Sequence, residues 1–314
     1  MIFPISGVEI NPFGLVAVGF FVGLLGGFFG VGGSFLAGPA LSAFGVPTNF
    51  MVGTDLAHIV GKSIVAARKH RMLGNIDLKL GVLMALGTVG GVELGAQLIE
   101  WLKPKPINGI AQKSFVLDCA VQGTFVVVLL AISSFMALEA YRTWQMTRRQ
   151  GTAAAGPRGD HSAYGHLARR VQRLPLGPFV SLPTSGIPRI SLGAILVVSF
   201  VGGMFSGFLG GGAGYIRMPA MIYLLGIPTH IAVGTDLFEI IVSAGYGTWS
   251  HAMKGNVDIM IALVMHTGAA LGAQIGATLT QYFGGPRIRL AFIPLPVLGA
   301  GIMIYKLATG LAHH

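Results

Sequence analysis

Stretches without charged residues constrain this chain more than any other feature. Only 10% of its 314 residues are charged and 53% are apolar, whereas about 25% of the residues of a soluble domain are charged. Several uncharged stretches approach or exceed the roughly 20 residues that an α-helix needs to cross a bilayer. Examples are residues 13–30, 80–92 with their flanks, 193–209 and 290–304. They lack the period-two alternation of barrel strands, so the sequence predicts an all-α membrane protein.

The glycines and the basic residues agree with a membrane location. The chain holds 48 glycines, and small residues let membrane helices approach one another closely. The formal net charge is +10, but the basic residues lie mainly in loops beside the apolar stretches, as the positive-inside rule predicts. We therefore expect a multi-pass protein of the cytoplasmic membrane, with the lipid bilayer as a partner and no nucleic acid.

The sequence also repeats itself. Residues 27–33, Gly-Phe-Phe-Gly-Val-Gly-Gly, are echoed by residues 207–213, Gly-Phe-Leu-Gly-Gly-Gly-Ala, and a match at a fixed offset is the signature of an internal repeat. Further matches pair 39–41 with 219–221, 45–48 with 226–229, 52–56 with 233–237, and 70–77 with 251–258. We predict two tandem membrane repeats, residues 1–145 and 190–314, joined by an arginine-rich cytoplasmic linker, residues 146–189.

Each repeat is predicted to contain about five helical segments, which gives a polytopic helical bundle of about 8–10 segments. In the first repeat they lie near residues 13–30, 34–45, 50–69, 76–101 and 115–142. The second segment covers about 18 Å, less than the ~30 Å hydrocarbon core, so it is a half-span or one arm of a re-entrant hairpin. Five crossings per repeat would invert the second repeat, and four would leave it parallel. Inversion places Arg287 and Arg289 inside, which favours inverted repeats.

A glycine run precedes the short segment in each repeat, and such paired interruptions are the best sequence indication of a transporter's binding site. Glycine runs can expose backbone N–H groups, and the helices that follow would direct the positive ends of their dipoles at an anion. The alternative is that the glycines only allow tight packing or a sharp turn. The candidate substrate-binding residues at these breaks are Gly30, Gly32, Gly33, Ser34, Gly210, Gly211, Gly212, Gly214 and Tyr215.

Ionisable residues on the next helix form a second group of candidates. In the first repeat, Asp55, His58 and Lys62 share one helical face. Ionisable groups inside a bilayer cost at least ~2.5 kcal/mol each, so they usually face a polar interior and pair or titrate there. The alternative is that the aspartates cap a helix start and the lysine reaches the interface. The proton-coupling candidates are Asp55, His58, Asp236 and Glu239, and further substrate-binding candidates are Thr54, Lys62 and Thr235.

Arg217 is the last substrate-binding candidate. It lies inside the short segment of the second repeat, where the first repeat has Ala37. An arginine at this depth needs a partner, and it could hold a sulfonate or carboxylate with two hydrogen bonds. The alternatives are that it reaches lipid headgroups or a structural acid such as Glu239.

Other polar residues in the predicted spans have simpler explanations. Asp77 and Asp258 each precede a helix, so we expect them to cap its first turn. Glu93 and Gln97 lie within an otherwise apolar helix. They either line the transport pathway or form hydrogen bonds across helices.

The motifs of the two copies resemble those of the sulfite exporter TauE/SafE family. They are Gly-Phe-Phe-Gly-Val-Gly-Gly at 27–33, Pro-Ala-Leu at 39–41, Gly-Val-Pro at 45–47 and Val-Gly-Thr-Asp-Leu at 52–56, with their second copies. The similarity covers both repeats and leaves out the linker. It implies transport of sulfur-containing anions such as sulfite, sulfoacetate or other organosulfonates, as export across the cytoplasmic membrane.

Together these features predict a secondary transporter, not an enzyme, that takes a small anionic substrate and needs no cofactor or metal. The two breaks would meet near the midplane, and one half would move against the other. The ionisable residues would allow coupling to protons. The alternatives are a passive anion channel, a membrane enzyme, for which only the His70/His251 pair speaks, and a scaffold protein. A homo-oligomer is compatible with all of these.

Overall fold

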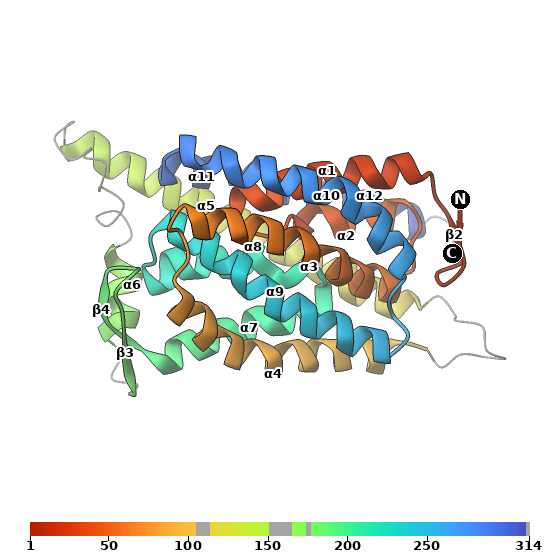
Figure 1. Ribbon diagram of the computed structural model, residues 1–314, viewed down its shortest axis with the longest axis horizontal. Coiled ribbons are helices and arrows are strands. Elements are labelled where there is room, and N and C mark those ends of the chain that lie inside the picture. Colours follow the sequence, from red (N-terminus) through yellow and green to blue (C-terminus); the bar gives the residue numbers. More distant parts are fainter. Residues whose placement is uncertain (105–113, 151–164, 174–176, 312–314) are drawn as a thin grey trace.

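In a computed structural model, the described residues 1–104, 114–150, 165–173 and 177–311 form a mostly helical structure. The long helices lie side by side along the longest axis of the molecule (Figure 1). The N-terminal elements are β1 (Ile2–Phe3), β2 (Val8–Glu9), α1 (Pro12–Phe29), α2 (Ser34–Ala43), α3 (Thr48–Met72), α4 (Leu78–Leu102) and α5 (Phe115–Gln150). The predicted linker contains α6 (Gly165–Arg173) and β3 (Phe179–Leu182), and it overlaps β4 (Ile187–Ser191). Its residues 151–164 and 174–176 lie outside the described part of the chain.

The C-terminal elements follow the same order of long and short helices. They are α7 (Leu192–Leu209), the 3₁₀ turn η3 (Gly211–Ala213), α8 (Gly214–Ala220), the π-helical turn η4 (Met221–Leu225), α9 (Thr229–Met253), α10 (Ile259–Leu279), the 3₁₀ turn η5 (Thr280–Tyr282), α11 (Gly285–Phe292) and α12 (Pro294–Leu311). The fold departs from all-α in the antiparallel hairpins β1–β2 and β3–β4. Strands of two to five residues are too short to leave a pattern in the sequence.

Seven helices within the described residues are long and apolar enough to cross a membrane. They are Pro12–Phe29, Thr48–Met72, Leu78–Leu102, Phe115–Arg142, Leu192–Leu209, Ile259–Tyr282 and Gly285–Ala308. Helix α9 is absent from this set although, at 25 residues, it is as long as α3. It carries two acidic residues in its middle, Asp236 and Glu239.

Glycine faces bring helices of the N-terminal and C-terminal sets into backbone contact. A Cβ atom added at Gly19, Gly23 or Gly27 of α1 would collide with a backbone carbonyl of α10. Helices α4 and α7 meet in the same way, since a Cβ at Gly91 or Gly95 would collide with the backbone of α7. Membrane helices can approach this closely only where small residues line the contact. The high glycine content therefore fixes which helices pair.

The first turn of α4 is held by residues from the C-terminal half of the chain. Asp77 caps the helix, because its Oδ1 accepts a hydrogen bond from Leu80 N at 3.0 Å. Its other carboxylate oxygen accepts one from Ser185 Oγ at 2.6 Å, and its backbone N–H donates to Thr235 Oγ1 at 2.9 Å. The prediction that Asp77 is a cap is confirmed.

The first turn of α10 is held by a matching set from the N-terminal half. Asp258 accepts hydrogen bonds from Met260 N and Ile261 N, which confirms it as a cap. Ser6 Oγ donates to Asp258 Oδ2 at 2.7 Å, and Asp258 N donates to Thr54 Oγ1 at 2.9 Å. The hairpin β3–β4 thus bonds to the cap of α4 in the N-terminal set, and the hairpin β1–β2 bonds to the cap of α10 in the C-terminal set. The two hairpins lie at opposite ends of the bundle (Figure 1).

Both glycine runs interrupt a helix, as the sequence predicted. Helix α1 ends at Gly30, whose φ is 74°, and α2 starts after Gly33, whose φ is 72°. Helix α7 ends at Gly210, with φ 83°, and the backbone stays in the left-handed region as far as Ala213, with φ 48°. A non-glycine residue rarely adopts such a φ. The second break is therefore the more constrained of the two.

We predict that Gly23→Ala lowers the thermal unfolding midpoint of the purified protein in detergent. The new Cβ would collide with the backbone of Ala269 on α10, and overpacking of this kind costs about 1–3 kcal/mol. Gly245→Ala in α9 is the matched control, because nothing lies within 4 Å of a Cβ built there. Equal midpoints for the two variants would contradict the proposed backbone contact.

Candidate functional site

The two breaks meet in the middle of the molecule. A Cβ built on Gly32 would lie 3.4 Å from the carbonyl oxygen of Gly211 and 3.3 Å from the side chain of Ile240 on α9. A Cβ on Gly214 would collide with the backbone of Val31 and with the carboxylate of Asp236. The predicted meeting of two discontinuous helices is therefore present, and α9 packs against it.

Several glycines of the breaks are in tight contact with their neighbours. A Cβ on Gly30 would collide with Val233, and one on Gly33 with Val22. A Cβ on Gly210 would lie 3.0 Å from the carbonyl oxygen of Val52, and one on Gly212 would lie 3.0 Å from Ile240. These contacts agree with the packing alternative for the glycines. The side chain of Ser34 lies outside the described part of the structure.

Arg217 is the centre of a buried ion-pair cluster between α8 and α9. Its side chain is fully buried, and its Nε donates to Asp236 Oδ1 at 3.0 Å. Its Nη2 forms an ion pair with Glu239 and lies 3.4 Å from Ser243 Oγ. Arg217 thus contacts Glu239, the acid named in the predicted structural alternative. The Nη1 atom has no hydrogen-bond partner among the described residues.

A second charged cluster lies on one face of α3. His58 Nδ1 is 3.0 Å from the carbonyl oxygen of Asp55 and 3.2 Å from its Oδ1. Lys62 Nζ is 2.9 Å from His58 Nε2. An ammonium can only donate, so with Lys62 charged Nε2 accepts and the imidazole is neutral, with its proton on Nδ1. The three side chains share the predicted face and are buried.

The two aspartates obtain their cations in different ways. Asp236 is paired with Arg217, which lies on a separate helix, α8. Asp55 is connected to Lys62 through His58, and all three lie on α3. Removing a charge from water into a membrane interior is costly unless the charge is paired. Both buried aspartates thus have a counter-charge, but only the pair of Asp236 with Arg217 links two helices.

The structure decides two alternatives that the sequence left open, for the aspartates and for Lys62, and gives partners for two threonines. The aspartates do not cap their helices, because α3 begins at Thr48 and α9 at Thr229, about two turns before them. Lys62 does not reach outward, since only 2% of it is exposed. The hydroxyls of Thr54 and Thr235 accept hydrogen bonds at the starts of α10 and α4.

Tyr215 lies in the first turn of α8, two residues before Arg217. Its ring lies against Phe125 of α5, with 5.7 Å between centroids. Its hydroxyl is buried and has no hydrogen-bond partner among the described residues. With Arg217 Nη1, this hydroxyl makes two buried donors without an acceptor. Buried polar groups usually find a partner, so these two donors are the best structural indication of an anion site.

One position that supports the site was missed in the sequence. A Cβ on Gly202 of α7 would collide with Cγ and Cδ of Arg217. This glycine makes the space in which the arginine stem lies. A glycine in a chain with 48 of them gives no signal of its own, so only the structure could identify it.

The paired histidines have structural roles. His70 Nε2 is 3.1 Å from the carbonyl oxygen of Gly27, and His251 Nε2 is 2.8 Å from that of Gly207. Each ring therefore ties the end of its helix, α3 or α9, to the end of α1 or α7. This explanation removes the observation that spoke for a membrane enzyme.

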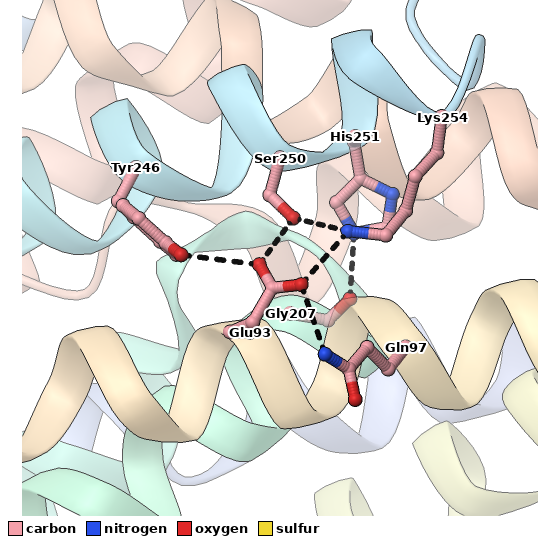
Figure 2. A network of polar contacts seen from close by, with 7 residues as sticks. All are labelled: Glu93, Gln97, Gly207, Tyr246, Ser250, His251 and Lys254. Carbon is pink, nitrogen blue, oxygen red and sulfur yellow. Dashed lines mark hydrogen bonds and ion pairs between the residues drawn. The ribbon is translucent and has the colours of Figure 1, made fainter.

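Glu93 forms hydrogen bonds across helices, which was one of the two predicted alternatives. Figure 2 shows its carboxylate on α4 between the side chains of Tyr246, Ser250 and Lys254 from α9 and its C-cap. Gln97, one turn further along α4, donates to the same carboxylate at 3.2 Å. The network lies away from the central cluster, toward the ends of α4 and α9.

Comparison with known proteins identifies a family for the chain. A family model described as sulfite exporter TauE/SafE matches residues 15–303. "Probable membrane transporter protein YunE" of Bacillus subtilis is 24% identical over 275 residues, which are 85% of this chain and 88% of that protein. "Probable membrane transporter protein YjnA" of the same species is 26% identical over 293 residues, 92% of this chain and 96% of that protein. No solved structure matches the chain significantly.

We predict that Arg217→Gln destabilises the protein strongly, because it leaves Asp236 and Glu239 without a buried counter-charge. Breaking a buried pair from one side costs about 3–5 kcal/mol, which would appear as a lower thermal unfolding midpoint. The triple variant Arg217→Gln, Asp236→Asn, Glu239→Gln should recover most of the loss, since no unpaired charge remains. A triple variant less stable than the single one would contradict the pairing argument.

Proposed function

Because this chain belongs to the sulfite exporter TauE/SafE family, we propose that it is a secondary transporter that exports small sulfur-containing anions, such as sulfite or organosulfonates, across the cytoplasmic membrane. Family membership makes it a multi-pass membrane transporter and not an enzyme. The anion class rests on the description of the family. The residues below supply a mechanism for it.

One observation carries the proposal for the substrate site. The two helix breaks meet beside Arg217 and Tyr215, each of which keeps one buried donor without an acceptor. A desolvated sulfonate or sulfite presents several oxygen acceptors, and a guanidinium with a hydroxyl can bond to them. The proposed site consists of these two side chains, Lys62 and the glycines of both breaks, Gly30, Gly32, Gly33, Gly210, Gly211, Gly212 and Gly214.

The proposal includes two inverted repeats with a cytoplasmic linker between them. Corresponding bonds support the repeats, since His70 and His251 contact corresponding glycines and Ser6 and Ser185 contact corresponding aspartates. Inversion is supported by the hairpins β1–β2 and β3–β4, which lie at opposite ends of the bundle (Figure 1). An axis in the membrane plane would relate two such repeats.

The basic residues support an orientation. The end of the bundle that carries β3–β4 also carries the last turn of α3, with Lys69 and Arg71, and helix α11, with Arg287. Arg289 of α11 bonds to Thr229 at the start of α9, which places α11 at that end. Because cytoplasmic loops are enriched in lysine and arginine, this end faces the cytoplasm in the proposal.

Proton coupling follows from the charges of the two clusters. Lys62 and Arg217 provide two positive charges, and three carboxylates face them: Asp55, Asp236 and Glu239. With all five groups charged and His58 neutral, the clusters carry one net negative charge. That charge repels an anion, so substrate binding requires protons on these acids or on His58. By linkage, lower pH then raises the affinity for the anion.

We therefore predict that proteoliposomes concentrate methanesulfonate when a pH gradient is imposed, and that its binding strengthens as the pH falls. Methanesulfonate keeps one charge near neutral pH, so the pH dependence belongs to the protein. Sulfite, thiosulfate, sulfate, sulfoacetate and acetate, each tested in turn, would define the substrate. Flux that cannot concentrate any of these anions, or that is unchanged when the proton gradient is collapsed, would instead indicate a passive channel.

A second prediction concerns the central residues. Glu239→Gln removes an acid that the coupling scheme requires, so flux driven by a pH gradient should fall at least tenfold, a loss of about 1.4 kcal/mol in transition-state terms. Exchange without a gradient should fall less. Arg71→Gln, an exposed change, is the matched control and should keep the wild-type flux. A Glu239→Gln protein with normal gradient-driven flux would remove that residue from the coupling scheme.

A further inference from the structure

The network around Glu93 continues a polar face that begins at the central cluster. On α9, six polar residues recur every three or four positions and so lie on one side of the helix. They are Asp236, Glu239, Ser243, Tyr246 and Ser250, followed by Lys254 at the C-cap. The first three contact Arg217, and the last three contact Glu93 of α4. One helix face therefore connects the buried site with the end of the bundle.

Four donors converge on the Glu93 carboxylate. Ser250 Oγ donates to its Oε2 at 2.6 Å and Tyr246 OH at 3.2 Å, while Lys254 Nζ donates to Oε1 at 3.0 Å. Gln97 completes the set. An ammonium, two hydroxyls and an amide around two oxygens make a complete binding site for a small oxyanion. Here the oxyanion belongs to the protein itself, as Figure 2 shows.

This anion site is partly exposed and lies toward one end of the bundle. Glu93 and Lys254 keep 30% and 20% of their side-chain surface exposed, unlike the fully buried Arg217 and Asp236. Lys103 at the end of α4 donates to the carbonyl oxygen of Lys254 at 2.9 Å, which adds a second ammonium nearby. In the proposed orientation this end is the outer one.

An apolar layer separates the site from the centre. A Cβ on Gly247, which lies on α9 between Ser243 and Ser250, would meet the side chains of Leu56 and Val92 at 2.9 and 3.2 Å. Both of these side chains are fully buried. An anion at Glu93 would therefore be one barrier away from Arg217. Conduction through channels likewise uses several weak sites, from which an ion can leave.

The corresponding face on the other side of the molecule lacks these groups. By the sequence matches, the positions of Glu93, Tyr246, Ser250 and Lys254 correspond to Gln274, Val65, Lys69 and Leu73. These four residues include no carboxylate and no hydroxyl group. This face therefore has neither the bound anion nor the hydroxyl donors. The site is therefore a feature of one side only.

From this geometry we propose that Tyr246, Ser250 and Lys254 form a second, outer binding site for small oxyanions such as sulfonates, and that the Glu93 carboxylate occupies it as a tethered competitor. The role of this outer site as an intermediate binding site on the export route rests on the proposed function, but the existence of the site does not. A tethered group competes at an effective concentration in the millimolar range. A free anion would occupy the site only when Glu93 leaves it, which makes Glu93 a gate.

The test counts anion-binding sites on the purified, full-length protein by calorimetric titration with methanesulfonate. Glu93→Gln keeps the shape of the side chain but removes the competing charge, so this variant should bind one equivalent more than the wild type. Adding Lys254→Gln should abolish the extra equivalent. Glu100→Gln is the matched control. It removes the acid that is paired with Lys103, a pair on which no hydroxyl of the described residues converges, so the number of bound anions should stay unchanged.

The same titration separates this proposal from the central site. In Arg217→Gln, Glu93→Gln protein the outer equivalent should persist, whether or not the central site binds an anion. An unchanged count in Glu93→Gln protein of normal helix content would overturn the proposal. An extra equivalent that survives Lys254→Gln would overturn it as well, because the anion would then lie elsewhere.

Discussion

A charge buried among membrane helices needs a counter-charge, and this requirement organises the middle of the molecule. Arg217 and Lys62 are both buried; Arg217 pairs with Asp236 and Glu239, and Lys62 is connected to Asp55 through His58. Glycines at neighbouring positions provide the space that the paired side chains occupy. Gly202 leaves space for the stem of the arginine, and Gly214 leaves space for the carboxylate of Asp236. The helix breaks thus serve the ion pairs, and the ion pairs hold the short helices in place.

The two halves differ in what a movement would cost. Arg217 lies on α8 and its acids lie on α9, so sliding one helix past the other separates opposite charges in a medium that screens them weakly. In the N-terminal half, Asp55, His58 and Lys62 all lie on α3. Helix α2 can therefore move past α3 without breaking that relay. A substrate anion that replaced one acid of Arg217 would lower the barrier on the C-terminal side only.

The sequence predicted the features that depend on local pattern. The apolar stretches, the glycine breaks, the caps Asp77 and Asp258, and the shared face of Asp55, His58 and Lys62 all follow from spacing along one helix. Features that depend on contacts between distant segments were not predictable. The ion pair of Arg217 with Asp236, the hydrogen bonds of Thr54 and Thr235 to opposite helix caps, and the space at Gly202 each join different secondary-structure elements. The hairpins β1–β2 and β3–β4 were too short to show a period.

The glycine contacts determine which parts of the molecule can move together. Helix α1 is in backbone contact with α10, and α4 with α7, along several turns. Neither pair can slide without driving Cα atoms and carbonyls into each other, because a close-packed interface resists continuous deformation. Each pair contains one helix from each half of the chain. Within the proposed transport mechanism, these contacts favour a movement of the α1–α10 and α4–α7 pairs relative to the helices that carry the charges, α3, α8 and α9, over a movement of one half of the chain against the other.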